Sequence, residues 1–194
     1  WLNRTAYITV NPSTGTPTQL ILNAMYNYMP DQYPTTTWTA ARNGVGNDYS
    51  STTNYIYSVY FTGTSSNTYL AMMRPYVTWD TSSIPDTATI TAVKVTLYGY
   101  GRDSLGTPDA SIIDCFPANP VSGTKTDYSK TTFTRQAADI PYSSFSTSGM
   151  NNWTLTNFTG INKAGYTTYM FDTSRGVDNL PPTWAASSQG GFLY

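Results

Sequence analysis

The residue types that most often carry catalysis are almost absent from this chain. It has no histidine and no glutamate, its 11 acidic residues are all aspartates, and its single cysteine is Cys115. Without an imidazole there is no base for a Ser-His-Asp or Cys-His relay and no histidine ligand for zinc or iron. One thiol cannot form an internal disulfide or a cysteine metal site, so Cys115 is most simply a small buried hydrophobic residue. We therefore predict a protein that is not an enzyme.

Paired aspartates are the remaining route to acid–base chemistry. A glycosidase or lyase of that kind needs two carboxyls roughly 5 to 9.5 Å apart, and no two aspartates have a spacing that predicts such a pair. Asp103 and Asp109 flank a Gly-containing loop that could bind Ca²⁺ through carboxylates and carbonyls, although the spacing is not that of an EF-hand. A solvated loop is the alternative, and we expect no other cofactor. Asp172 and Asp178 are a weaker pair, because Arg175 between them can neutralise either carboxylate.

Aromatic rings on the surface could bind sugars by stacking. The chain has five tryptophans and 17 tyrosines, and Trp38, Trp153 and Trp184 lie in stretches rich in Thr or Asn where a ring could face solvent. The alternative is that these rings fill the core, because tryptophan is usually mostly buried. Both interpretations stay open for each of the three tryptophans.

Three Asn-x-Thr triplets, at Asn3, Asn152 and Asn157, are candidate N-glycosylation sites. Asn11 is excluded because a proline follows it. Such triplets also arise by chance in a chain rich in Asn and Thr. They matter only in a host that glycosylates.

The charge of the chain gives no sign of an acidic partner. The formal net charge is −1, and the ten basic residues are scattered singly with no stripe beside aromatic residues, so we expect no nucleic-acid binding. Only 11% of the residues are charged, while hydroxyl groups are abundant. This composition is typical of proteins outside the cell, on the cell surface or on a virion. No apolar run approaches the roughly 18 residues of a membrane span.

β-branched, aromatic and turn residues dominate, which predicts a single all-β domain. Residues 5–10 alternate apolar and polar side chains and predict a strand, while a short helix competes within 18–30. Residues 31–54 look like a loop around one short strand at 35–40. From residue 55, strands recur at the spacing of a β-sandwich, and in 91–98 Val93, Val95 and Leu97 should face the core. The further strands are expected within 55–61, 68–79, 90–100, 110–116, 139–145, 152–160 and 167–174.

One stretch resembles a known family. Residues 74–100 carry an Arg, an aromatic-Asp pair, Ser-Ser-Ile-Pro and a Thr-rich strand that ends in Leu-Tyr, and residues 144–171 contain an Ile-Asn-Lys-x-Gly turn. This pattern resembles the DNRLRE-type secreted β-sandwich modules, which are related to carbohydrate-binding modules. The matching residues are Arg74, Trp79, Asp80, Ser82, Ser83, Ile84, Pro85, Leu97 and Tyr98. The resemblance implies a jelly-roll sandwich over residues 31–194, commonly non-catalytic, that follows an N-terminal extension at 1–30.

The extension suggests how copies of the chain associate. Members of that family run on into a closing strand, whereas this sequence stops at Tyr194 and has a surplus strand at its other end. We expect that strand to fill the sheet of a neighbouring copy through Ala6, Tyr7, Ile8 and Val10, and such head-to-tail exchange builds filaments. The leading hypothesis is thus a structural subunit of an extracellular filament or other surface assembly. The alternatives are a carbohydrate-binding adhesion module and a surface protein of a virion or phage fibre.

Overall fold

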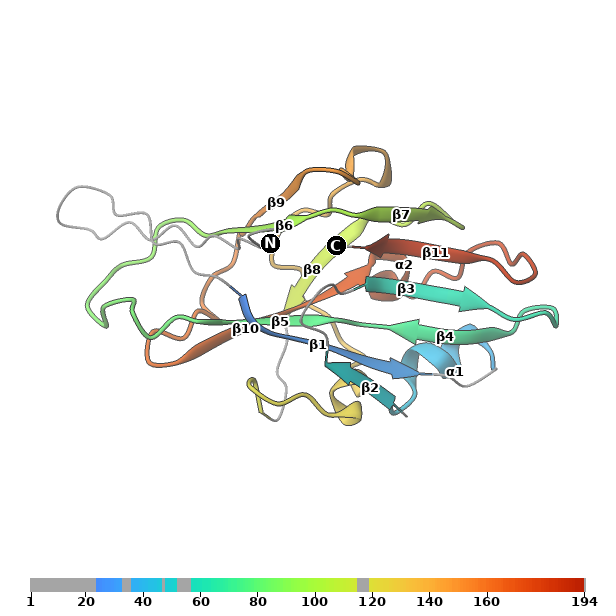
Figure 1. The fold of residues 1–194 in the computed structure, drawn as a ribbon, viewed down its shortest axis with the longest axis horizontal. Coiled ribbons are helices and arrows are strands. Elements are labelled where there is room, and N and C mark those ends of the chain that lie inside the picture. The colour runs from blue at the N-terminus through green and yellow to red at the C-terminus, as the bar shows by residue number, and fades with distance from the viewer. Residues whose placement is uncertain (1–23, 33–35, 47, 52–56, 115–118, 194) are drawn as a thin grey trace.

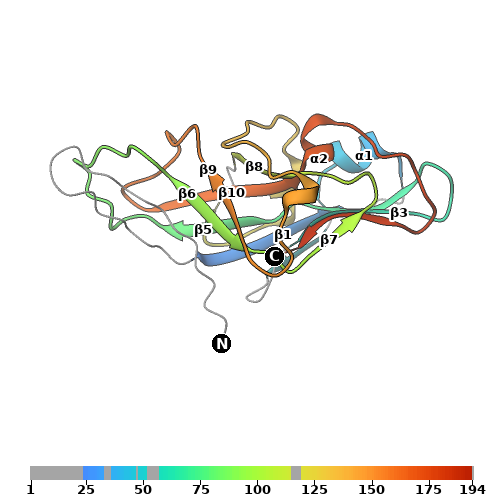
Figure 2. The ribbon, with the colours of Figure 1, turned by 90° about the horizontal axis from the view of Figure 1, so that it is seen from above.

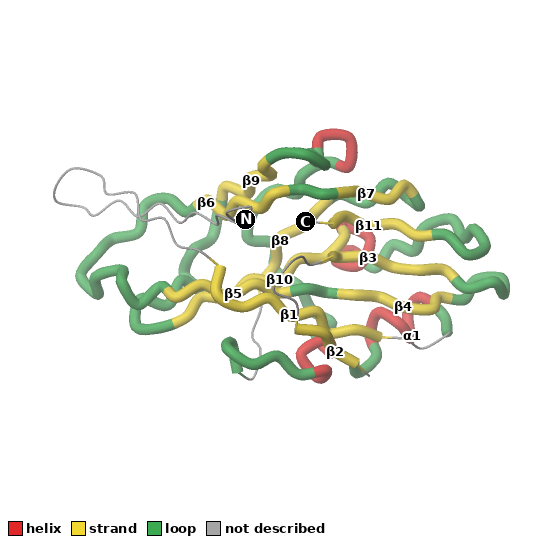
Figure 3. Tube along the Cα trace, in the orientation of Figure 1, coloured by secondary structure: helices red, strands yellow, loops and turns green. Residues whose placement is uncertain are grey.

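The structure is a computed structural model that describes residues 24–32, 36–46, 48–51, 57–114 and 119–193. The expected all-β class is confirmed, because strands and loops make up nearly all of the described chain (Figure 3). The two α-helices have six and five residues, and no described helix is long and apolar enough to cross a membrane. The elements are β1 (Ala24–Gln32), α1 (Trp38–Asn43), β2 (Asp48–Ser51), β3 (Tyr57–Thr62), β4 (Tyr69–Met73), β5 (Tyr76–Asp80), β6 (Lys94–Tyr98), β7 (Gly101–Ser104), β8 (Ala110–Asp114), β9 (Met150–Thr154), β10 (Tyr166–Thr173), α2 (Ser174–Asp178) and β11 (Gln189–Leu193), with 3-10 helices η1 (Lys125–Ser129) and η2 (Tyr142–Ser144).

The main sheet is antiparallel and forks in its middle. Its order is β7-β11-β3-β4-β1-β5-β10-β8, with β2 on β1. β4 and β5 form one line of chain, which is visible in Figure 1, and both pair with β1. On their other side β3 pairs with β4, whereas β10 pairs with β5. The fork therefore lies at Arg74 and Pro75, between the two strands.

The branches belong to two layers of a sandwich-like fold. In Figure 2, β8, β9 and β10 lie on one side, and β1 and β7 on the other. β6 and β9 form a separate two-stranded sheet, and bridges from residues 135–140 connect β8 with Leu155, just beyond β9. The chain leaves β6 and enters β7 through Gly99. A Cβ at Gly99 would lie 1.7 Å from the Ser146 carbonyl oxygen, so this passage requires a glycine.

The main core lies between these layers. The expected inward row of Val93, Val95 and Leu97 is confirmed, because all three are buried. Lys94 and Tyr98 are exposed on the opposite face, as the alternation predicts. Thr96 shares that face but is buried, and its hydroxyl donates a hydrogen bond to Asn152 Oδ1 at 2.8 Å. Other members of the core include Val77, Trp79, Ile84, Ile112, Trp153, Phe171 and Phe192.

Three expectations about local structure were wrong. Of the strand expected at 35–40, residues 38–40 begin helix α1 instead, because the Thr37 side chain accepts the Ala40 N–H as an N-cap and Trp38 packs inward. No helix forms within the described part of 18–30, since pairing with β2, β4 and β5 makes residues 24–32 a strand. β1 thus crosses the boundary expected between residues 30 and 31. The strand expected within 139–145 contains η2 instead.

Candidate functional site

No described strand pairs with the edge of β6 that faces away from β9. Leu155 N donates to the Val93 carbonyl and Gly99 N donates to the Gly149 carbonyl, so the odd-numbered residues of this stretch bond to β9. Backbone groups in an antiparallel strand alternate between its two sides. The N–H and C=O of Lys94, Thr96 and Tyr98 therefore point away from β9. They have no backbone partner within the part of the chain that the structure describes.

The same edge continues into β7. Leu105 N donates to the Gln189 carbonyl, which places Gly101 and Asp103 on the side of β11 and Arg102 on the opposite side. No strand among the described residues pairs with β7 on that opposite side. We call residues 94–102 the open edge. It offers a row of backbone donors and acceptors to an added strand.

Exposed apolar side chains lie beside the open edge. Tyr98 stands directly opposite Met150 in the β6–β9 register, and both are exposed. Tyr100, two residues further on, is 77% exposed. The Tyr98 hydroxyl donates to the Ser148 carbonyl at 2.9 Å, which holds its ring along the surface. Tyr98, Tyr100 and Met150 are called the Tyr98 patch, and together with the open edge they form the candidate interaction site.

Arg102 lies at the β7 end of the open edge, and neighbouring residues bind its guanidinium. It donates to the carbonyls of Tyr142 and Phe145 and lies over the Tyr142 ring, 4.8 Å from its centroid. The guanidinium is thus directed toward η2. Lys94, at the other end, is exposed. Lysine at a strand edge normally discourages uncontrolled pairing.

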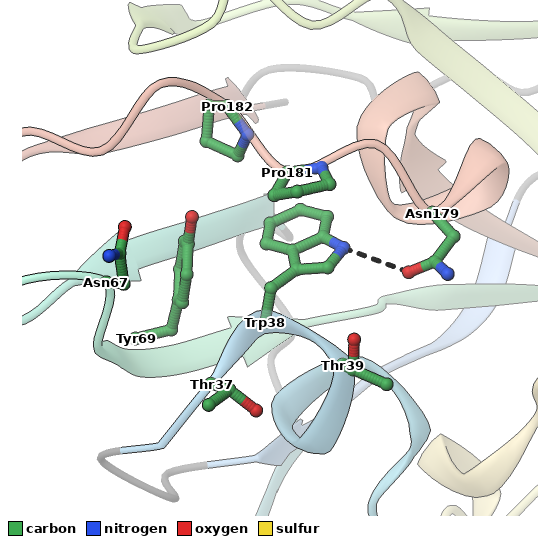
Figure 4. A pocket seen from close by; sticks show the side chains of 8 residues that line it. All are labelled: Thr37, Trp38, Thr39, Asn67, Tyr69, Asn179, Pro181 and Pro182. Atoms are coloured by element: carbon green, nitrogen blue, oxygen red, sulfur yellow. Dashed lines mark hydrogen bonds between the residues drawn. The ribbon is translucent and has the colours of Figure 1, made fainter.

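A second feature is a pocket of about 310 Å³ between α1, the start of β4 and the segment that follows α2. Figure 4 shows Trp38 and Tyr69 side by side beneath Pro181 and Pro182. Trp38 Nε1 donates to Asn179 Oδ1 at 3.1 Å. The rings of Trp38 and Tyr69 meet edge to face, with their centroids 5.1 Å apart. The pocket is lined by Thr37, Trp38, Thr39, Asn67, Tyr69, Asn179, Pro181 and Pro182.

Every polar group that lines the pocket is neutral. The Asn67 amide and the Thr39 and Tyr69 hydroxyls have no hydrogen-bond partner within the described chain, and burial raises the pKa of Tyr69, which keeps its hydroxyl protonated. Such groups suit a ligand with several hydroxyls. Trp38 is only 5% exposed and Tyr69 only 3%, so their ring faces are covered. A ligand would meet ring edges and the proline rings rather than a flat aromatic platform.

The other two tryptophans proposed for sugar contact lie elsewhere. Trp153 is 1% exposed, sits edge to face with Phe171, and donates from Nε1 to the Ala110 carbonyl at 3.1 Å. Its burial in the core argues against any contact with a sugar. Trp184 is half-buried and donates to the Thr68 carbonyl at 3.2 Å. It does not line the pocket.

The aspartates proposed for calcium do not converge. The Asp109 carboxylate accepts the Tyr142 N–H at 2.7 Å, and Asp103 lies in β7. Among the described residues no three aspartates or cysteines gather closely enough to bind a metal ion. Asp178 pairs with Arg135 at the surface, with 2.8 Å between the charged groups. The predictions for a further set of residues lie outside the described part of the chain: Asn3, Ala6, Tyr7, Ile8, Val10 and Cys115.

The buried ion pair at the fork was not predicted from the sequence. Arg74 is fully buried and its Nε donates to Asp172 Oδ2 at 3.0 Å. The Arg74 guanidinium also donates to the carbonyls of Tyr128 and Lys130. Burial raises the pKa of the Asp172 carboxyl, while Arg74 and the Thr173 N–H oppose that shift. Arg74 and Asp172 each lie within a segment that the sequence analysis expected to be a strand, 68–79 and 167–174, but no spacing connected the two residues.

No family model, curated protein or solved structure matches the chain. The resemblance of residues 74–100 to the DNRLRE-type modules therefore remains a hypothesis. Arg74, the first residue of that pattern, has a structural place at the fork. Ile84, within the Ser-Ser-Ile-Pro turn, is buried in the core. These two residues of the pattern thus have structural roles in the fold.

Proposed function

We propose that this protein is a non-catalytic structural subunit of an extracellular, cell-surface or virion assembly, in which each copy accepts a β-strand from its neighbour at the open edge. The observation that carries the proposal is the row of backbone groups at Lys94, Thr96 and Tyr98, which have no backbone partner among the described residues. Strand addition gives its affinity through main-chain hydrogen bonds. The exposed Tyr98 patch beside the edge adds apolar surface that an added chain would cover.

The donor in this proposal is the segment of residues 5–10 of a second copy. In a strand placed beside β6, Ala6, Ile8 and Val10 would follow the core-facing row of Val95 and Leu97. The hydroxyl-rich residues between them would continue the outer face of β6. The two rows of the segment therefore match the two faces of the acceptor. A jelly-roll topology, with the added strand as one of its members, is part of this proposal.

Contacts of this type join different surfaces of successive copies. A heterologous contact that does not close into a ring extends into a filament. The nearly neutral, hydroxyl-rich chain suits such a fibre, because it creates no strong repulsion between copies. The role of the protein would then be mechanical, because continuous β-structure would transmit tension along the fibre.

The test removes one backbone donor from the open edge. Lys94→Pro removes the N–H that faces the open edge, whereas Lys94→Ala removes the same side chain and keeps that N–H. The Lys94 N–H does not bond to β9, so both variants should fold. Light scattering and electron microscopy should show polymers for the wild type and Lys94→Ala, and shorter or no polymers for Lys94→Pro. Equal polymerisation of both variants, or a wild type that stays monomeric at every concentration, contradicts the proposal.

A second candidate function, sugar binding, is favoured by the pocket at Trp38. Its neutral amide and hydroxyl groups would recognise the hydroxyls of a saccharide. Calorimetry and a glycan array on two variants distinguish the pocket from Trp184. Asn67→Ala changes a residue that lines the pocket, whereas Trp184→Phe changes a tryptophan outside it. Loss of binding in Asn67→Ala alone supports the pocket. An absence of glycan affinity in the wild type removes this candidate and leaves the assembly proposal untouched.

A further inference from the structure

We infer that Asn157 is the acceptor of an N-linked glycan on the folded protein. Asn157, Phe158 and Thr159 form one of the three Asn-x-Thr triplets, and both Asn157 and Thr159 are exposed. The triplet lies in a turn that follows β9, not within a strand. The inference concerns a covalent modification and does not depend on the proposed assembly.

The geometry of this turn presents the reactive nitrogen. Asn157 Oδ1 accepts both the Thr159 N–H at 3.1 Å and the Thr159 hydroxyl at 2.9 Å. The amide oxygen is therefore occupied, and the Asn157 Nδ2 has no hydrogen-bond partner within the described chain. Phe158 packs partly buried against the main core, which anchors the turn. Thr159 thus orients the Asn157 side chain through its Oδ1, and no described residue bonds to its Nδ2.

The surroundings leave room for a sugar. A Cβ placed on Gly160, the residue after the triplet, would meet no atom within 4 Å. The turn is therefore open at Gly160, and Asn157 and Thr159 beside it are exposed.

Asn152 offers a matched contrast in the same protein. It is also exposed, but it lies inside β9 and its Oδ1 accepts the Thr96 hydroxyl at 2.8 Å. The middle residue of its triplet is Trp153, which is buried in the core. A transferase that binds all three residues of the triplet would have to pull β9 out of the sheet. We therefore expect Asn152 to remain unmodified in the folded protein.

The reaction transfers a saccharide from an oligosaccharide diphospholipid. The Asn157 Nδ2 forms a bond to C1 of the first sugar, and the bond from C1 to the diphosphate oxygen breaks. The lipid diphosphate leaves with the electron pair of that bond, and the proton lost from the amide nitrogen balances its charge. No oxidation or reduction takes place, and the donor belongs to the class that N-glycosylation uses.

The experiment uses the folded, unglycosylated full chain. It is incubated with an oligosaccharyltransferase and an oligosaccharide diphospholipid, with a short Asn-x-Thr peptide as the control for enzyme activity. Intact mass and glycopeptide mapping should show one glycan at Asn157. Asn157→Gln and Thr159→Val should lose that mass increase, and Asn152→Gln should keep it. Circular dichroism verifies that each variant is folded. A chain that is not modified while the peptide is, or that is modified at Asn152 as readily as at Asn157, overturns the inference.

Discussion

The fork of the main sheet and the open edge treat polar groups in opposite ways. At the fork, Arg74 and Asp172 are withdrawn from water and pair with each other, and the rings of Tyr128 and Phe133 lie 4.3 and 4.9 Å from the guanidinium carbon. At the open edge, backbone donors and acceptors have no partner in the described part of the chain, and they lie at the border of the sheet. Burial makes an unmatched charge costly, whereas an unpaired group at an edge can bond to water until another strand arrives. The fork therefore stabilises one subunit, and the edge is available to a second.

Removal of one charge at the fork should have the largest effect. Asp172→Asn leaves the buried Arg74 guanidinium without its carboxylate, which should lower the free energy of unfolding by about 3 to 5 kcal/mol. Asp178→Asn removes an exposed partner of Arg135 and should cost about 1 kcal/mol or less. Urea unfolding at neutral pH measures both. A cost for Asp172→Asn as small as that for Asp178→Asn would show that the fork is no more demanding than the surface.

Gly99 lies at the junction of β6 and β7, where the chain passes close to the Ser146 carbonyl. Gly99→Ala places a methyl group against the Ser146 carbonyl and should cost about 1 to 3 kcal/mol, because the backbone there must shift. Gly160→Ala, which enters open space, is the control and should change stability by roughly 0.5 kcal/mol or less. Thermal unfolding compares the two variants. If Gly99→Ala proves neutral, the passage between the layers is less confined than the structure shows.

The face of the donor strand that enters the sheet can be tested by charge. Ile8→Asp places a carboxylate in the row expected to face the core of the next copy, and should weaken association about 10- to 100-fold, the worth of one buried isoleucine. Thr9→Asp adds the same charge to the outer row and should have a much smaller effect. Sedimentation velocity over a range of concentrations gives both association constants. Equal losses of affinity in the two variants would mean that the acceptor does not distinguish the inner row of the donor strand from its outer row.

A surface carboxyl away from both regions should show the smallest effect. The Ser82 hydroxyl and N–H donate to Asp80, at 2.6 and 2.9 Å, and lower the pKa of that carboxyl. The folded state then binds its proton less tightly than the unfolded state. Its contribution to stability is complete above the unfolded pKa of about 3.9 and is lost as the pH falls through the folded pKa. Ser82→Ala should raise the pKa of Asp80 in an NMR titration, and an unchanged value would mean that the Ser82 hydroxyl has no influence.

Sequence periodicity predicted the strands that have one buried face. It failed where pairing with distant segments determines whether residues form a strand. The alternation of Val93, Val95 and Leu97 was sufficient to identify β6 and its core-facing row. Residues 24–32 have no such clear pattern, and they form a strand because β2, β4 and β5 pair with them. Thr37 was a usable signal for α1, since threonine is a favoured N-cap.

The candidate site was less predictable than the fold. Whether the N–H of Lys94 or of Val95 faces the open side depends on the register between β6 and β9, which the sequence of β6 alone does not contain. The sequence proposed three tryptophans as equal candidates for sugar contact. Tertiary packing distinguishes them, since Trp153 enters the core and Trp38 lines a pocket that residues as distant as Asn179 complete. The pairing of Arg74 with Asp172 is similarly a product of the fork.

The most direct test of strand addition is amide hydrogen exchange, residue by residue, in the monomeric and assembled states. Backbone groups without partners exchange quickly, and an added strand protects them. The account predicts that the amides of Lys94 and Tyr98 exchange fast in the monomer and become protected on assembly, while Val95 and Leu97, which already bond to β9, change little. Assembly that leaves Lys94 and Tyr98 exchanging as fast as before, with protection gained elsewhere, would contradict it.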